Sequence, residues 1–310
     1  MTLTLPDTPT DRSVPGDGIT LHARDWGGGA ARAVVLLHGL SSNARIWDGV
    51  APRLAAAGLR AVAIDQRGHG ESEQPSSGYD FATVTGDLAH ALEALGIRAP
   101  LLVGHSWGAN VALQYAADRP GGVAGLALVD GGFGDVADWA GGDLEEVRRR
   151  LRPPRFAVPL ETWLAGSARW LPPGVDPSEP WVAEFLRAGV EVDAGGIATA
   201  RFHFDNHMQV IDALYEQRPS RLLAELTCPV LLCPAGGRAA PARSRGESTG
   251  EPRTDAPDPS RHPAVQRALE LAPDARVTWF EDAMHDIPLQ DPAELAAELA
   301  SFAMEVGANG

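Results

Sequence analysis

The residues with the clearest chemical potential form the pentapeptide Gly104-His105-Ser106-Trp107-Gly108, which matches the pattern G-x-S-x-G. The pentapeptide directly follows an aliphatic run and directly precedes a stretch with helical spacing. In that context the pattern predicts a sharp strand-to-helix turn that exposes the serine hydroxyl at a helix N-terminus, where developing negative charge is favoured. A glycine-rich turn without chemistry is the alternative. We expect Ser106 to be a nucleophile.

A second glycine turn, His38-Gly39-Leu40, ends an earlier aliphatic run. A glycine at this place lets the backbone turn so that the next N–H group can point into a site. Together with the N–H group that follows the serine, it would hold the negative oxygen of a tetrahedral intermediate. We therefore expect the backbone N–H groups of Leu40 and Trp107 to form an oxyanion hole.

These two motifs, a third motif and a late histidine together resemble the α/β-hydrolase superfamily. The third motif is the segment 65–72, which reads Asp-Gln-Arg-Gly-His-Gly-Glu-Ser. The resemblance covers residues from about Gly18 to Phe302, apart from an inserted segment and one long loop. In this superfamily the third motif is mainly structural, so we do not expect Asp65, Arg67 or His69 to be catalytic.

A serine hydroxyl is a poor nucleophile at neutral pH and needs an adjacent base. The resemblance implies that the base is His285, which follows the last aliphatic run and precedes the final helical stretch. His105 is expected to point to the opposite side of the turn and to pack. His203 and His207 have a spacing that could hold zinc, but no third ligand accompanies them, so we expect no metal site.

The acid that would orient the base departs from the superfamily's common pattern. Most members place an aspartate shortly after the strand that corresponds to Val230–Cys233, where this sequence has Arg238. The superfamily's alternative position, the end of the preceding strand, holds Asp130. An orienting acid must be held rigidly, which favours Asp130 over the acids of the long loop. The alternative for Asp130 is a structural role in an Asx-type turn that caps the strand. Asp135 and Asp138 are the next candidates for the orienting acid.

Aliphatic runs alternate with helical stretches on both sides of these motifs. Runs that are apolar throughout and separated by helices predict an α/β fold, with a mostly parallel sheet covered by helices on both faces. The expected strands are Ala33–Leu37, Arg60–Ile64, Pro100–Val103, Gly125–Val129, Pro229–Cys233 and Arg276–Phe280. The expected helices are Trp47–Ala57, Phe81–Leu95, Asn110–Ala117 and Pro292–Met304.

The alternation breaks in the middle of the chain, which divides it into two units. We expect residues 1–132 and 221–310 to form the α/β-hydrolase core, and residues 133–220 to form an inserted, mostly helical cap. Within the core, residues 238–263 are rich in Pro, Ser, Arg, Gly and Asp and have almost no apolar residues. Such a segment cannot bury enough surface to offset its ordering entropy, so we expect a mobile surface loop.

Composition limits the classes of partner. The chain has 310 residues, 44% of them hydrophobic and 22% charged, which is typical of a globular protein. The formal net charge of −15 disfavours nucleic acids and anionic membranes. All 26 basic residues are arginine, which excludes a lysine nucleophile. Without a signal peptide pattern or an apolar run of 18 residues, the default expectation is a cytoplasmic protein. The oligomeric state stays open.

The cap is expected to form the roof of a pocket for a small-molecule substrate. The candidate lining residues are Leu40, Trp107, Trp139, Trp163, Phe202 and Met208. For most of them, packing of the cap on the core is the alternative. An apolar roof favours an uncharged acyl or alkyl group.

The expected chemistry is acyl transfer by a Ser-His-Asp set, without a cofactor, on a small or medium carboxylic ester. A thioesterase, lactonase, C–C bond hydrolase or cofactor-free perhydrolase would share these residues. Epoxide hydrolases and haloalkane dehalogenases of the superfamily use an aspartate at the place of Ser106, which argues against both. The alternative from another class is a ligand-binding protein with slow or no turnover. An Asp130 carboxylate far from His285 would favour it.

Overall fold

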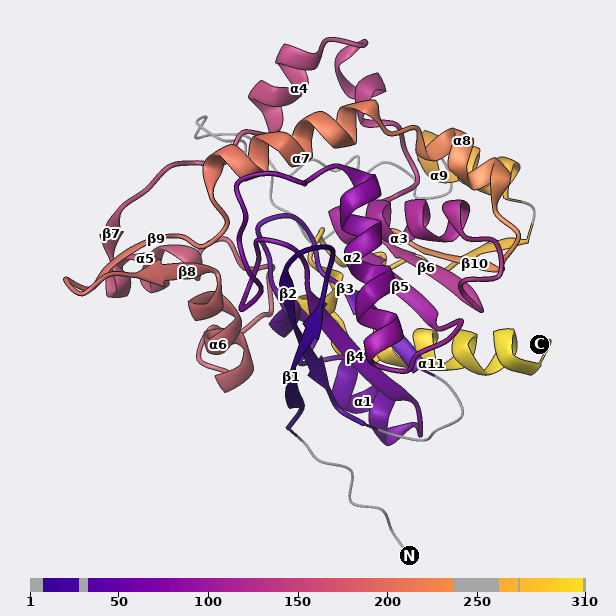
Figure 1. The fold of residues 1–310 in the computed structure, drawn as a ribbon, viewed down its shortest axis with the longest axis horizontal. Helices are drawn as coiled ribbons and strands as arrows, with labels where there is room; N and C mark the ends of the chain where they lie inside the picture. Colours follow the sequence, from indigo (N-terminus) through magenta and orange to yellow (C-terminus); the bar gives the residue numbers. More distant parts are fainter. Residues whose placement is uncertain (1–7, 28–32, 237–261, 273, 309–310) are drawn as a thin grey trace, which may run out of the picture.

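The computed structural model describes residues 8–27, 33–236, 262–272 and 274–308 of the chain. An eight-stranded sheet lies at its centre, in the order β1-β2-β4-β3-β5-β6-β10-β11 (Figure 1). The strands are β1 (Thr10–Pro15), β2 (Thr20–Asp25), β3 (Ala33–Leu37), β4 (Arg60–Asp65), β5 (Leu101–His105), β6 (Gly125–Val129), β10 (Val230–Cys233) and β11 (Ala275–Val277).

The sheet is mostly parallel, which confirms the expected fold class. From β4 through β3, β5, β6 and β10 to β11, every neighbouring pair is parallel. The pairs β1–β2 and β2–β4 are antiparallel, and we did not anticipate these two strands. Five of the six β1 residues are exposed, so β1 has no aliphatic run to indicate it.

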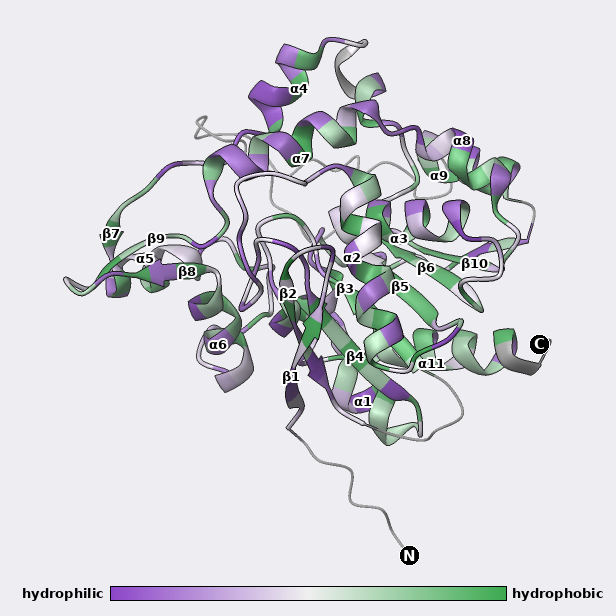
Figure 2. Cartoon of the chain, viewed as in Figure 1, coloured by the Kyte–Doolittle hydropathy of each residue, from purple (hydrophilic) through white to green (hydrophobic). Residues whose placement is uncertain are grey.

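Alternate residues of the central strands enter two separate hydrophobic clusters because successive side chains point to opposite faces. In β3, Val35 and Leu37 join one cluster, whereas Val34 and Leu36 join the other. All four are almost wholly buried. In Figure 2 the central strands are coloured as hydrophobic along most of their length. This two-sided burial requires helices on both faces of the sheet.

Helices cover each face and hold the strand ends in place. α2 (Phe81–Ala94), α3 (Trp107–Asp118), α8 (Pro219–Glu225) and α9 (Pro263–Leu271) contribute to the first cluster. α1 (Ala51–Ala56) and α11 (Pro292–Ala308) contribute to the second, together with the short η1 (Ala44–Trp47) and α10 (Ile287–Gln290). In α2 an apolar stripe is buried at Val84, Leu88 and Leu92, and the Asp80 side chain caps its N-terminus.

The inserted segment contains both helices and a small sheet. Its helices are η2 (Val136–Ala140), α4 (Leu144–Leu151), α5 (Leu160–Ser167), α6 (Pro180–Ala188) and α7 (Phe204–Glu216). A three-stranded antiparallel sheet of β7 (Val158–Pro159), β9 (Ile197–Ala200) and β8 (Val190–Val192) was not expected, because strands of two to four residues are too short to show an alternating pattern. α4 packs against α7 at one end of the molecule (Figure 1).

The ends of two expected segments fall at helices of the structure. The cap boundary at residue 220 falls inside α8, which packs against α3 of the core and α9. Of the long loop at 238–263, residues 238–261 lie outside the described residues, and Pro263 begins α9. In the part of the chain that the structure describes, no helix is both long and apolar enough to cross a membrane.

The turn that follows β4 is held by buried polar bonds, as the resemblance implied. The Asp65 carboxylate accepts hydrogen bonds from the backbone N–H groups of Ala44 (2.6 Å) and Glu71 (3.1 Å), and it contacts His22 Nδ1 at 2.7 Å. The Asp65 carboxylate therefore joins η1, β2 and the turn to one another. Its role in the structure is to hold this turn.

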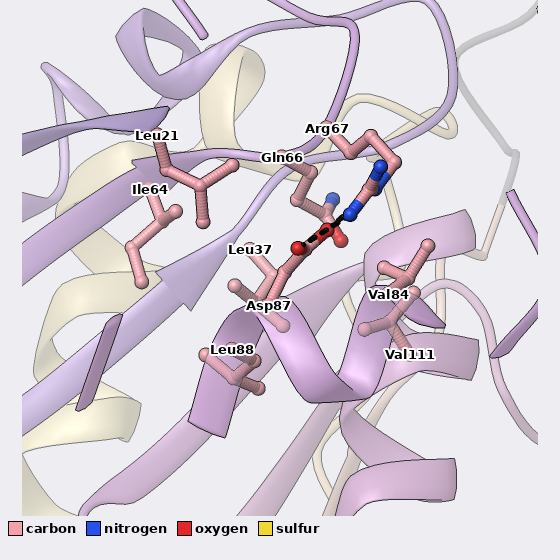
Figure 3. A pocket seen from close by; sticks show the side chains of 9 residues that line it. All are labelled: Leu21, Leu37, Ile64, Gln66, Arg67, Val84, Asp87, Leu88 and Val111. Atoms are coloured by element: carbon pink, nitrogen blue, oxygen red, sulfur yellow. Dashed lines mark hydrogen bonds and ion pairs between the residues drawn. The ribbon is translucent and has the colours of Figure 1, made fainter. Parts of the chain in front are cut away.

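Arg67 and Asp87 form a bidentate pair beneath the same turn. Arg67 Nε and Nη2 each lie 2.7 Å from a carboxylate oxygen of Asp87, and both side chains are buried. The pair lines a small cavity of about 10 Å³ between α2 and the sheet, and Figure 3 shows the two side chains pointing toward one another. None of the residues lining this cavity is Ser106, Asp130 or His285.

Candidate active site

The pentapeptide around Ser106 forms the expected turn between a strand and a helix. β5 ends at His105, α3 begins at Trp107, and Ser106 between them has φ 54° and ψ −122°. A Cβ atom on Gly104 would lie 2.2 Å from the Gly108 carbonyl oxygen, and one on Gly108 would lie 2.5 Å from the His38 carbonyl oxygen. Only glycine therefore allows the close approach that exposes the serine.

Ser106, His285 and Asp130 form a continuous chain of hydrogen bonds. The Ser106 Oγ atom lies 2.9 Å from His285 Nε2, and the Asp130 Oδ2 atom lies 2.7 Å from His285 Nδ1. Because the carboxylate is an acceptor, His285 donates through Nδ1–H, which leaves Nε2 free to accept the serine proton. The three side chains come from the ends of β5 and β6 and from the segment between β11 and α10.

Asp130 is fixed by the neighbouring strand. Its second carboxylate oxygen accepts a hydrogen bond from the Ala235 N–H group (2.9 Å), and its own N–H group donates to the Cys233 carbonyl oxygen (3.0 Å). Asp130 also has a φ of 43°, and a Cβ atom on the next residue, Gly131, would lie 2.4 Å from the Ser106 carbonyl oxygen. The carboxylate is thus held rigidly against the serine turn, as an orienting acid must be.

The side chains of His285 and Asp130 are partly exposed, and each shifts the pKa of the other. The side chain of His285 is 57% exposed and that of Asp130 is 21% exposed. Partial burial lowers the pKa of His285, but the hydrogen bond and charge of Asp130 and the charge of Asp286 together raise it above its usual 6.5. Burial raises the pKa of Asp130, but the hydrogen bond and charge of His285, the hydrogen bond from the Ala235 N–H group and the charge of His105 together lower it by more, so the net pKa of Asp130 is lowered. Asp130 therefore stays ionised near neutral pH.

His105 lies under the loop that carries His285. Its Nε2–H group donates to the His285 carbonyl oxygen at 2.8 Å, and the two rings are 4.9 Å apart. Burial, and secondarily the charge of His285, lowers the pKa of His105 to about 4, so the ring is neutral at working pH. We expected a packing role, and the sequence offered no signal for this bond across 180 positions.

The backbone near Leu40 approaches the nucleophile closely. A Cβ atom on Gly39 would lie 3.0 Å from Ser106 Cβ and 3.5 Å from Ser106 Oγ. Trp107 is the first residue of α3, and the first N–H groups of a helix have no partner within it. Both segments of the expected oxyanion hole therefore border the serine, while the role of the two N–H groups stays a prediction.

The expected lining residues have different environments. Trp107 and Phe202 are buried, and their ring centroids lie 5.3 Å and 3.8 Å from that of His69. Leu40 and Met208 are partly buried against the first hydrophobic cluster. Trp163 stacks on Phe156 at 4.6 Å. Trp139 lies in η2, but its side chain is outside the described part. Substrate contact by these side chains stays a prediction.

The other acids and histidines have different partners or lie outside the description. Asp135 accepts hydrogen bonds from the Ser220 N–H and hydroxyl groups, and Asp138 is exposed within η2. Both ring nitrogens of His207 are bonded, to Ser41 and Leu151. Among the described residues, no group of three or more His, Cys, Asp or Glu side chains is arranged to hold a metal ion. Arg238 and the acids of the long loop are not described.

Comparisons with known proteins agree with this architecture. Residues 32–207 match the model of a family described as alpha/beta hydrolase fold. A relative in Klebsiella pneumoniae, named "Putative carbamate hydrolase RutD", is 34% identical over 216 residues, which are 68% of this chain and 74% of the relative. The chain belongs to the alpha/beta hydrolase fold family.

Other curated relatives match over a shorter region. The "Non-heme chloroperoxidase" of Streptomyces lividans is 40% identical over 114 residues, 36% of this chain and 41% of the relative. "Epoxide hydrolase A" of Mycobacterium tuberculosis is 38% identical over 126 residues, 39% of each chain. The match therefore spans about two fifths of these two relatives.

Solved structures extend the similarity of fold to nearly the whole chain. The structure of E-2-(acetamidomethylene)succinate hydrolase aligns with a TM-score of 0.75 at 22% identity and covers 95% of this chain and 98% of that one. A thioesterase domain from the curacin biosynthetic pathway aligns with a TM-score of 0.72 at 20% identity and covers 94% and 99%. At this level of identity the alignments establish the fold.

Proposed function

We propose that the protein is a serine hydrolase that cleaves a small or medium, largely apolar carboxylic ester by acyl transfer. The observation that carries this proposal is the bonded series of Ser106, His285 and Asp130, with contacts of 2.9 Å and 2.7 Å. Contacts of this length are what a nucleophile, its base and an orienting acid require. A carboxylate so close to the base also favours an enzyme over a binding protein without turnover.

The reaction would run in two steps. His285 Nε2 takes the hydroxyl proton as Ser106 Oγ attacks the carbonyl carbon, and the C–O bond of the leaving group then breaks as His285 returns the proton to it. In the second step His285 takes a proton from water, the hydroxide oxygen attacks the acyl-enzyme, and Ser106 leaves with the proton. Asp130 keeps the tautomer of His285 fixed throughout.

In this proposal the backbone N–H groups of Leu40 and Trp107 stabilise the oxyanion. The position of Trp107 at the start of α3 supports its part, because that N–H group has no partner inside the helix. The close approach of Gly39 to Ser106 supports the role of the next N–H group, that of Leu40, as the second oxyanion donor. Donors fixed before the reaction are the largest single contribution in many such sites.

The nucleophile separates this proposal from one group of relatives. Superfamily epoxide hydrolases use an aspartate at the elbow, whereas this chain has Ser106 there. A serine attacks a carbonyl carbon and forms an ester intermediate that water can hydrolyse. The curated relatives named epoxide hydrolase therefore share the architecture with this chain, and we do not extend their reaction to it.

The choice of an apolar ester rests on the expectation that aromatic and aliphatic side chains line the site. Phe202 and Met208 come from the inserted segment, and Leu40 and Trp107 from the core.

The test is hydrolysis of p-nitrophenyl esters from acetate to decanoate, with thioester, amide and carbamate analogues in parallel. We expect ester turnover that is lost in Ser106→Ala. Faster turnover of another acyl class would replace the ester as the proposed substrate class. Turnover that is unchanged in Ser106→Ala would overturn the mechanism.

A further inference from the structure

Ser41, directly after Leu40, has a backbone conformation that calls for an explanation. Its φ is 57°, in the left-handed region that non-glycine residues rarely adopt. In the described part of the chain, four non-glycine residues have a positive φ, and two of the others are Ser106 and Asp130. Backbone strain of this kind persists only where surrounding contacts hold it, and it gathers at functional sites.

Two histidines hold Ser41 in this conformation. The Ser41 N–H group donates to His69 Nε2 at 3.2 Å, and the Ser41 Oγ atom lies 2.9 Å from His207 Nδ1. Because His69 Nδ1 lies 2.9 Å from the carbonyl oxygen of Arg67, that nitrogen carries the proton and Nε2 accepts. The N–H group of Ser41 is thus engaged with His69 and is not free to act as an oxyanion donor.

His207 connects this loop to the inserted segment. The residue lies in α7, and its Nε2–H group donates to the carbonyl oxygen of Leu151, the last residue of α4, at 3.1 Å. Its Nδ1 atom is therefore unprotonated and accepts the Ser41 hydroxyl proton. Burial lowers the pKa of His207 to about 4, so the ring keeps this arrangement at neutral pH.

α4 and α7 are further joined by an ion pair. Arg148 of α4 donates to both carboxylate oxygens of Asp212 in α7, at 2.7 Å and 2.8 Å. Leu151 and His207 therefore belong to one unit of the inserted segment. His207 is the place where this unit contacts the loop next to the nucleophile.

The N-terminal end of α7 is fixed to the core by other bonds. Gln74 accepts from the His203 N–H group at 2.8 Å and donates to the Arg201 carbonyl oxygen at 2.8 Å. Asn206 donates to the Tyr79 hydroxyl at 2.8 Å, and Gln209 donates to the Ser76 carbonyl oxygen at 2.9 Å. α7 is therefore anchored well enough to position a residue of the core through a single side chain.

We propose that His207 and Ser41 are positioning residues, through which the inserted segment sets the conformation of the Leu40 loop and thereby the placement of the oxyanion donor. The inference rests on the proposed serine chemistry and deepens it. Neither residue contacts the reacting atoms. Their contribution is to hold the Leu40 N–H group where negative charge develops. Their loss would therefore reduce the stabilisation of the transition state more than the binding of the substrate.

The experiment measures kcat and KM for a p-nitrophenyl ester in Ser41→Ala, His207→Phe and the double variant. We expect kcat to fall about 10- to 100-fold in each single variant, since misplacing a catalytic group by about 1 Å can cost about 100-fold. KM should change less than about threefold. The double variant should be no slower than the slower single variant, because both changes break the same bond.

Two further variants separate positioning from general destabilisation. His207→Asn places a carbonyl oxygen near the position of Nδ1 and should recover part of kcat. Tyr215→Phe removes a bond from α7 to the Gly142 carbonyl oxygen (2.6 Å) that neither reaches Ser41 nor anchors the N-terminal end of α7, and it should keep the wild-type kcat. Thermal unfolding shows whether each variant is folded at the assay temperature.

The outcomes distinguish this inference from the proposed function. A wild-type kcat in folded Ser41→Ala, or losses that multiply in the double variant, would overturn the inference and leave the proposed function intact. An equal loss in Tyr215→Phe would also overturn it. A wild-type protein without any serine-dependent turnover would overturn both.

Discussion

The Asp130 carboxylate lies 2.7 Å from His285 Nδ1, although 155 positions separate the two residues in the chain. The acid stands at the end of β6, and the residue after β10 that contacts it is Ala235, which donates its N–H group to the other carboxylate oxygen. Most members of the superfamily carry the acid in the segment after β10. In this chain that segment instead holds Asp130, which follows the neighbouring strand β6, in place. Parallel strands make this exchange possible because their carboxyl ends lie at the same edge of the sheet.

The first prediction concerns pH. The base must be neutral to accept the serine proton, so kcat/KM should fall as pH drops through the pKa of His285, with a midpoint above 6.5. Asp130→Asn removes the bond and charge that raise this pKa, so the midpoint should move to lower pH. The plateau should fall by about 10⁴, the cost of the corresponding change in a serine protease. A pH–rate profile of both proteins checks this, and an unchanged midpoint would contradict it.

The second prediction concerns His105, which holds the backbone of the base. His105→Phe removes the donor to the His285 carbonyl oxygen, so the loop of His285 should lose its fixed position relative to Ser106. We expect kcat to fall about tenfold with KM little changed, because orientation is lost and binding is not. His105→Gln, which can place an N–H group near Nε2, should recover part of kcat. Equal kcat in the Phe and Gln variants would argue against this role.

The third prediction concerns the glycines of the serine turn. Gly104→Ala would place a methyl group 2.2 Å from the Gly108 carbonyl oxygen, so the backbone must shift. We expect a loss of about 1–3 kcal/mol in the free energy of unfolding, as in overpacked cores, together with loss of activity. Gly166→Ala is the matched control, because no atom lies within 4 Å of its added Cβ atom and the residue is in α5. That change should be neutral or stabilise by up to about 1 kcal/mol.

The fourth prediction concerns the Arg67–Asp87 pair beside the small cavity of Figure 3. Asp87→Ala leaves a buried guanidinium without its partner, which should cost about 3–5 kcal/mol in the free energy of unfolding. The exposed pair of Arg149 and Glu146 provides the comparison, and Arg149→Ala should change stability by less than about 1 kcal/mol. Denaturant unfolding measures both. Similar losses in the two variants would show that burial does not decide the strength of the pair.

Features encoded by local sequence could be predicted. The turn at Ser106 is fixed by two glycines between a strand and a helix, and the central strands follow from their aliphatic runs. Asp130 could be proposed as the orienting acid because an aspartate ends an aliphatic strand and glycines follow it. The position of Asp130 relative to His285 nevertheless depends on strand order, which no local pattern specifies.

Other features depend on contacts between distant segments or on very short elements. β1 pairs along its length with β2 but buries only one residue, so no apolar pattern indicated it. The three short strands of the inserted segment carry too few residues for a period. His105 and His207 were visible in the sequence, but their partners are backbone and side-chain atoms of other segments. Tertiary packing alone brings these together.

The measurement that tests the central claim most directly is covalent labelling with a fluorophosphonate, followed by mass spectrometry of the modified peptide. We predict one adduct, on Ser106, in the wild-type protein. Labelling should be absent in Ser106→Ala and much slower in Asp130→Asn, because the base then loses its orienting acid. Labelling at another residue, or a rate in Asp130→Asn equal to that of the wild type, would contradict the assignment of Ser106, His285 and Asp130 as one catalytic unit.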